Sequence, residues 1–176
     1  MTVFDSAFAA VVGEEGGLTT NPLDPGNWTG GKQNAGTCKG TKYGVSAAAY
    51  PTLDIANLTL ADAKAIYKKY YWDKISGDDL PPPVALIVFD AAINSGWNRA
   101  AKWLQAACGV GADGIIGPVT ISAAKKVSPV GLVIECNAQR LLFMASLPTW
   151  RTFGLGWTRR VVRLGIAATG FEEHAV

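Results

Sequence analysis

The sequence predicts an α+β fold that is predominantly α-helical, with a small β-hairpin or irregular sheet near residues 18–45. Apolar residues recur at helical spacing along most of the 176-residue chain, and residues 84–95 are apolar nearly all round, as in a helix at the centre of a domain. Between residues 18 and 45 this period gives way to Gly, Thr, Asn and Pro, with β-prone pieces at LTT and TKYGV. A chain of this length can fill one core, so one domain with two lobes is the default.

The first predicted helix covers residues 3–15. Phe4, Phe8 and Val11 share one face at helical spacing, and Gly16–Gly17 supply the expected C-terminal stop.

The later helices follow from the same period. Thr59 and Asp62 form a capping-box-like start for a helix that reaches about Lys74. The segment SGDDLPPP then interrupts the pattern and is the best candidate for a hinge between lobes. The helix at 84–95 follows, and further helices are predicted near residues 98–108, 118–127, 129–147 and 156–168.

Composition excludes several classes of protein. Charged residues make up 17% of the chain and the net charge is +2, without the dense basic stripe of a nucleic-acid binder. No run approaches eighteen uninterrupted apolar residues, so we predict no membrane span. No Lys or Arg precedes the first short apolar stretch, so we predict no standard signal peptide.

The reactive side chains narrow the possible chemistry. The single histidine, His174, lies close to the C-terminus, which argues against Ser-His-Asp and Cys-His catalysis. The three cysteines are far apart and lack metal-ligand spacing, and the glycine-rich loops lack the context of a nucleotide site. We therefore predict no metal and no cofactor, and carboxylates become the candidate catalysts.

Two carboxylates stand out in VVGEEGGLTTNPLDPG. If the first helix continues, Glu15 falls on its core-facing edge, where apolar neighbours disfavour a charged carboxyl group. A carboxyl group that keeps its proton near neutral pH can act as a general acid. Asp24 lies in a polar turn, and two carboxyl groups in contrasting surroundings are expected of a glycosidase. Spacing alone still favours the plainer interpretation, an ordinary helix-end glutamate and an ordinary turn aspartate.

A family resemblance changes this balance. EEGGLTTNPLDPGNWTGG and GTKYGVSAAAYP resemble the opening of the glycoside hydrolase family 108 muramidases, which are phage and prophage endolysins. LTLADAKAIYKKYYWDKI and VFDAAINSGWNRAAKWLQ resemble the rest of that catalytic region, and GADGIIGPVT and FGLGWTRRV are similar to the peptidoglycan-binding region usually fused to it. The resemblance implies a lysozyme-like fold, with a catalytic region at 1–96 and a helical peptidoglycan-binding-like region at 97–176. Because the apolar helix at 84–95 needs cover on several sides, we expect the two regions to co-fold as one compact unit.

The same resemblance assigns the catalytic residues. Glu15 directly precedes Gly-Gly and matches the family's catalytic acid, whereas Glu14 has no counterpart. Asp24 matches the aspartate of the Asp-Pro-Gly turn, and Thr41 is the candidate third member, with Thr29 as the runner-up. The implied reaction is hydrolysis of the β-1,4 bond between N-acetylmuramic acid and N-acetylglucosamine. A lytic transglycosylase and a non-catalytic peptidoglycan-binding protein remain as alternatives.

Three more residues are candidates for substrate binding. Tyr43 could stack on a sugar ring, although packing against a neighbouring helix suits it equally well. Asp90 and Asn94 lie one turn apart on the apolar helix, where a structural polar network is the favoured interpretation and a substrate contact from Asn94 the second. Trp97 could border the cleft, although a place in the core is the safer interpretation.

The C-terminal stretch GWTRRVVRLGI places Arg159, Arg160 and Arg163 near one face of an amphipathic helix. Closing the second lobe is the plainer role for this helix, and contact with an anionic envelope surface is the sharper one. We expect a monomer whose partner is bacterial peptidoglycan and not nucleic acid. With no export signal, the resemblance implies accumulation in the host cytoplasm and release to the cell wall through a holin pore.

Overall fold

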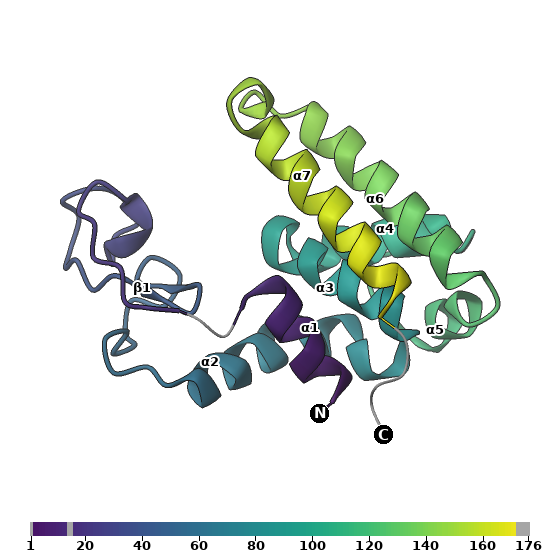
Figure 1. Ribbon diagram of the computed structural model, residues 1–176, viewed down its shortest axis with the longest axis horizontal. Helices are drawn as coiled ribbons and strands as arrows, with labels where there is room; N and C mark the ends of the chain where they lie inside the picture. The colour runs from purple at the N-terminus through teal and green to yellow at the C-terminus, as the bar shows by residue number, and fades with distance from the viewer. Residues whose placement is uncertain (1, 14–15, 172–176) are drawn as a thin grey trace. The chain divides into compact units, whose positions relative to one another are not determined.

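The computed structural model describes residues 2–13 and 16–171. Within them, seven α-helices and one two-stranded antiparallel sheet confirm the predicted, predominantly helical α+β class (Figure 1). Contacts divide the chain into two compact units, which we call the hairpin unit (Phe8–Tyr67) and the helical unit (Met1–Ala7 and Lys68–Val176). None of the helices in the described residues combines the length and apolarity that a membrane span requires.

This division differs from the one expected from motifs. SGDDLPPP lies inside the helical unit, where the Ser76 hydroxyl donates a hydrogen bond of 3.0 Å to the carbonyl oxygen of Ile116. The expected hinge is therefore not where the contacts divide the chain. The functional regions 1–96 and 97–176 stay a prediction.

Helix α1 (Val3–Val11) is shorter than predicted. The amide of Gly13 donates to the carbonyl of Phe8, and its φ of +83° is the left-handed conformation in which helices commonly end. The helix therefore stops before Gly16–Gly17. Glu14 and Glu15 themselves lie outside the described residues.

The sheet of the hairpin unit forms where the β-prone segments were predicted. Strands β1 (Thr41–Lys42) and β2 (Val45–Ser46) pair antiparallel, with Lys42 opposite Val45. Tyr43 and Gly44 form the two-residue turn with φ of +50° and +72°, and a type I′ hairpin needs positive φ at both positions. Thr19 adds an isolated bridge to Thr41, so the LTT segment joins the same sheet.

Helix α2 (Leu60–Tyr67) confirms the predicted capping box. The Thr59 amide and hydroxyl both donate to Asp62 Oδ2, at 3.0 and 2.6 Å, and the Asp62 amide donates to Thr59 Oγ1 at 3.1 Å. These bonds from Thr59 to the charged form lower the pKa of Asp62. Beyond Tyr67 the predicted regular helix is replaced by a π-helical turn and two 3-10 turns at Lys68–Trp72, Asp73–Ile75 and Gly77–Asp79.

The helical unit is built around α3 (Pro82–Ser95), in which every residue from Pro83 to Ala92 is buried. Three helices cover it: α4 (Trp97–Ala107), α6 (Pro129–Ala145) and α7 (Trp150–Thr169). Helices α6 and α7 lie side by side, and the short α5 (Pro118–Ala124) packs on α4 (Figure 1). The all-round apolar character of residues 84–95 is explained by this position.

Aromatic rings fill one side of this core. Phe4, Trp72 and Phe89 meet edge to face, with ring centroids 5.4 to 6.0 Å apart. Trp72 is fully buried and its indole N–H donates to Asp78 Oδ1 at 2.8 Å, so its polar atom is satisfied.

Candidate active site

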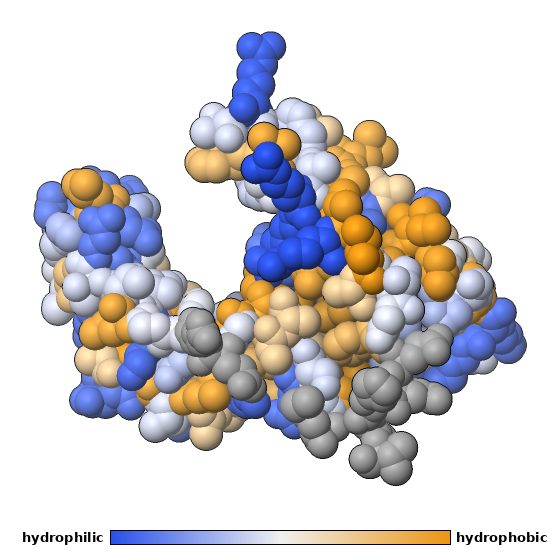
Figure 2. All heavy atoms as spheres, in the orientation of Figure 1, coloured by the Kyte–Doolittle hydropathy of each residue, from blue (hydrophilic) through white to orange (hydrophobic). Residues whose placement is uncertain are grey.

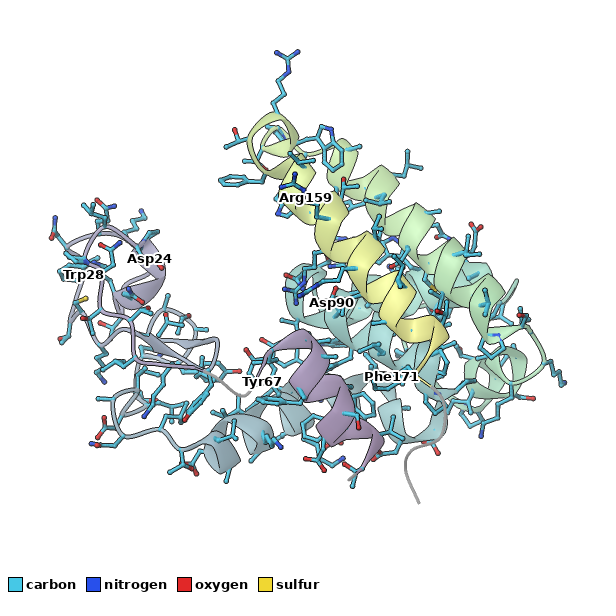
Figure 3. The ribbon with its side chains drawn as sticks, in the orientation of Figure 1. Asp24, Trp28, Tyr67, Asp90, Arg159 and Phe171 are labelled. Atoms are coloured by element: carbon cyan, nitrogen blue, oxygen red, sulfur yellow. The ribbon has the colours of Figure 1, made fainter. Side chains whose placement is uncertain are left out.

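Asp24 lies at the start of a single 3-10 turn, Pro25–Asn27 (Figure 3). Its Oδ1 accepts a hydrogen bond of 2.8 Å from the Gly26 amide, so the carboxylate caps the turn. The residue is exposed, as its polar turn predicted. Asp-Pro-Gly thus acts as a local device that fixes the direction of one carboxylate.

A buried asparagine ties this turn to the sheet. The side chain of Asn27 is fully buried, donates to the Asn21 carbonyl at 3.0 Å and accepts from the Thr41 hydroxyl at 2.7 Å. The hydrogen bond therefore ties Thr41 directly to the last residue of the turn that Asp24 caps. Asn27 was not predicted as a site residue from the sequence. The signal that could have identified it is its position directly after Asp-Pro-Gly.

Thr41 also holds the segment that follows the Glu-Gly-Gly motif. Its amide and carbonyl exchange two backbone hydrogen bonds of 2.9 Å with Thr19. The alternative, Thr29, instead accepts the Thr37 amide at 2.9 Å within its own loop. Of the two threonines, Thr41 is therefore the one that connects the Asp24 turn with the segment after Gly16–Gly17.

Gly16 and Tyr43 make a close contact beside the predicted acid. A Cβ atom at Gly16 would lie 2.9 Å from both the Cα and the amide nitrogen of Tyr43, which no side-chain rotation relieves. At Gly17 such an atom would meet nothing within 4 Å. Tyr43 is half-buried and packs on this segment, so the packing role considered for it is filled by an irregular segment and not by a helix. Its role in stacking on sugar stays a prediction.

The predicted acid lies outside the described residues, so the structure describes its neighbours Gly13 and Gly16 but not Glu15 itself. Within the hairpin unit, the hydroxyl of Thr41 is bonded to Asn27, the last residue of the turn that Asp24 caps. Asn94 and Trp97 belong to the helical unit.

On α3, Asn94 donates to the carbonyl and to Oδ1 of Asp90, at 2.8 and 3.1 Å, which confirms the polar network between them. Trp97 is 38% exposed at the start of α4, so its placement in the core was wrong. Contacts of Asn94 and Trp97 with substrate stay a prediction.

Asp90 is the centre of an ion cluster that the sequence did not reveal. Fully buried on α3, it accepts from Arg140 Nη1 of α6 at 2.5 Å and from Nε and Nη2 of Arg160 of α7 at 2.8 and 2.6 Å (Figure 3). A buried carboxylate requires such partners, and the cluster joins three helices. Arg160 is thereby bonded to the buried Asp90 and is half-buried, whereas Arg159 and Arg163 are exposed.

Comparison with known proteins identifies a family and a similar solved structure. A family model described as Glycosyl hydrolase 108 matches residues 8–96, a range that contains Glu15, Asp24 and Thr41. Among solved structures, that of SagA from Brucella abortus is 35% identical and superimposes with a TM-score of 0.79, covering 98% of this chain and 97% of that one. No curated protein matches. The peptidoglycan-binding character expected for residues 97–176 stays a prediction, because the family match ends at residue 96.

Proposed function

This chain belongs to the glycosyl hydrolase 108 family, and on that basis we propose that it is a muramidase that cleaves the β-1,4 bond between N-acetylmuramic acid and N-acetylglucosamine. Membership of the family makes the chain a glycoside hydrolase and supports peptidoglycan as its substrate. The bond and the roles of individual residues are our proposal.

The observation that carries this proposal is the extent of the family match. It runs from residue 8 to residue 96 and includes the Glu-Gly-Gly motif, the Asp-Pro-Gly turn and the first strand of the hairpin. Glu15, Asp24 and Thr41 therefore all fall within the matched range.

In the proposed mechanism, Glu15 donates its proton to the glycosidic oxygen as the bond to the anomeric carbon breaks. The leaving sugar hydroxyl needs this proton, because an alkoxide is a poor leaving group at neutral pH. Asp24 and Thr41 position the water that attacks the sugar, and Asp24 accepts a proton from that water. The product is a new reducing end on N-acetylmuramic acid.

The geometry of the hairpin unit supports the pairing of Asp24 with Thr41. The Gly26 amide orients the Asp24 carboxylate, and Asn27 connects the same turn to the Thr41 hydroxyl. A carboxylate and a hydroxyl supported by neighbouring hydrogen bonds are suited to orienting a water molecule. This arrangement favours hydrolysis over a transglycosylase reaction, which needs no attacking water.

Mass spectrometry of purified sacculi digested with the protein tests the proposal. A muramidase releases fragments that end in reducing N-acetylmuramic acid. A lytic transglycosylase would leave 1,6-anhydro ends instead, and a non-catalytic binding protein would release nothing. Either of these results would overturn the proposed reaction.

We also propose that the protein acts as a phage or prophage endolysin, which accumulates in the host cytoplasm and reaches the wall through a holin pore. This proposal is supported by the resemblance of its motifs to those enzymes. Expression in cells with and without a co-expressed holin tests it, because lysis should require the holin.

A further inference from the structure

A cavity of about 240 Å³ lies in the helical unit where the end of α3 meets α4, α6 and α7. Its lining contains three arginines, Arg99, Arg140 and Arg160, and no acidic side chain. Figure 2 shows strongly hydrophilic side chains gathered over the end of α3 and the adjoining part of α7. Asp90, which is not part of the lining, pairs with Arg140 and Arg160, so the three arginines and this one carboxylate keep a net positive charge. The cavity is therefore suited to a ligand with negative charge.

Arg140 supplies the strongest indication of a ligand. Its side chain is 1% exposed, and one of its nitrogens, Nη1, donates a hydrogen bond to Asp90. Neither Nε nor Nη2 makes a hydrogen bond with the described residues, although both atoms are buried. Leaving the buried N–H donors of a charged group unpaired costs free energy, so these two N–H groups of Arg140 need an acceptor.

Arg99 contributes a second guanidinium. Its central carbon lies 4.1 Å above the ring of Phe143, and its Nη1 donates to the Ser95 carbonyl at 3.1 Å. Stacking on the ring holds the planar guanidinium in place, while the remaining N–H groups along its edges stay available as hydrogen-bond donors. Phe143 and the half-buried Trp157 give the cavity an apolar wall beside these charges.

We propose that this cavity binds a carboxylate of the peptide stems of peptidoglycan. A guanidinium matches a planar carboxylate with two parallel hydrogen bonds, and the apolar wall suits the small side chain that a carboxylate of alanine carries beside it. The choice of ligand rests on the proposed function, because the stem peptides are the carboxylates that the substrate supplies. The site would hold the peptide part of a strand whose glycan part is cleaved elsewhere.

Nuclear magnetic resonance on the full chain tests this site with N-acetyl-D-alanyl-D-alanine as the probe. The free acid should shift the Nε–H signal of Arg140 in a saturable way. The C-terminal amide of the same dipeptide should not, because it lacks the charge. Inorganic phosphate is the third probe and distinguishes a carboxylate site from one for phosphate groups.

Two variants locate the binding. Arg140→Lys keeps a charge beside Asp90 but removes the paired donors, and Arg99→Gln removes the guanidinium at an exposed position where folding should be retained. Each should weaken binding of the free acid by about tenfold or more. Arg151→Gln is the matched control, since it removes the same charge from an exposed position on α7 outside the cavity and should leave Kd unchanged.

Equal binding of acid and amide, unchanged Kd in Arg99→Gln, or tighter binding of phosphate than of the dipeptide would each overturn the proposal. So would the absence of any saturable shift. The dipeptide contains no glycosidic bond, so its failure to bind leaves the cleavage reaction untouched. Conversely, binding of the dipeptide can still be measured if the chain fails to cleave sacculi.

Discussion

At the scale of single residues, Gly16 sets how closely the segment after the predicted acid approaches the hairpin. The backbone of Tyr43 occupies the space that any side chain at Gly16 would need. Tyr43 itself holds a positive φ, which is uncommon for a residue with a side chain and is seen where the surroundings enforce it. Steric exclusion by Tyr43 therefore explains why the first glycine of the Glu-Gly-Gly motif is a glycine.

Gly16→Ala should destabilise the protein by about 1–3 kcal/mol, because the new methyl group overlaps backbone atoms of Tyr43. It should also reduce lytic activity, since a shift of ~1 Å beside the chemistry can cost about 10²-fold in rate. Urea unfolding and turbidity of sacculi measure the two effects. Gly17→Ala meets no atom within 4 Å and should change both far less; equal effects at the two glycines would refute the steric account.

Asp90 binds side chains of α3, α6 and α7 in the helical unit. Asp90→Ala leaves the 1%-exposed Arg140 without its counter-charge, which should cost about 3–5 kcal/mol of unfolding free energy. Asp79→Ala, at an exposed aspartate, should change stability by no more than about 0.5 kcal/mol. A loss below about 1 kcal/mol for Asp90→Ala, measured by urea unfolding, would show that the cluster is not needed for stability.

Part of the polar cluster around Asp90 could be predicted from the sequence. An aspartate and an asparagine one turn apart on an apolar helix indicate a polar network, and Asn94 does bond to Asp90. The arginine partners could not be predicted, because they lie 50 and 70 residues further along the chain. Pairing over such distances depends on how helices pack, and local pattern carries no information on that.

At the scale of elements, apolar periodicity located most helices but not all of their ends. The capping box of Thr59 and Asp62 marked the start of α2 because it is a local hydrogen-bond pattern. The predicted end of α1 was wrong, because the C-terminal stop was assigned to the pair Gly16–Gly17. The helix instead ends before Gly13, whose left-handed conformation is common at helix ends. Helix α7 begins at Trp150, six residues before the prediction, because two glycines weaken the signal of its first turns.

Helix α7 also separates the three clustered arginines by role. Arg160 is bound to Asp90, while Arg159 and Arg163 are exposed, so we propose that these two make any contact with an anionic envelope. Replacing Arg159 and Arg163 by Gln should weaken binding to permeabilised cells at low salt. The difference should shrink as salt rises, since exposed charges are screened over about 8–10 Å at physiological ionic strength.

The matched control for this pair is the exchange of the exposed Lys125 and Lys126 for Gln, which removes the same charge from the end of α5. Co-sedimentation with cells measures both proteins. Equal loss in the two would mean that net charge alone, and not α7, governs attraction to the envelope.

At the scale of the whole molecule, α3 is the last helix within the family match, and it packs against the C-terminal helices. The family match ends at residue 96, just after α3, yet α4, α6 and α7 supply the cover for this helix. A chain truncated after residue 96 would expose side chains that each contribute about 1.5–3 kcal/mol when buried. We predict that it does not fold cooperatively, as circular dichroism with thermal melting would show. A soluble, lytic chain with a sharp melting transition would contradict this.

The central claim is that Glu15 is the general acid of a muramidase, and the rate at which Glu15→Gln releases soluble fragments from sacculi tests it most directly. Glutamine keeps the size of the side chain but cannot donate a proton, so the rate should fall by about 10²–10⁴-fold or more, while the melting temperature stays at or above that of the parent. Glu14→Gln, the adjacent matched control, should keep the parent's rate. If Glu15→Gln releases fragments at the parent's rate, Glu15 is not the acid and the mechanism proposed for this chain is wrong.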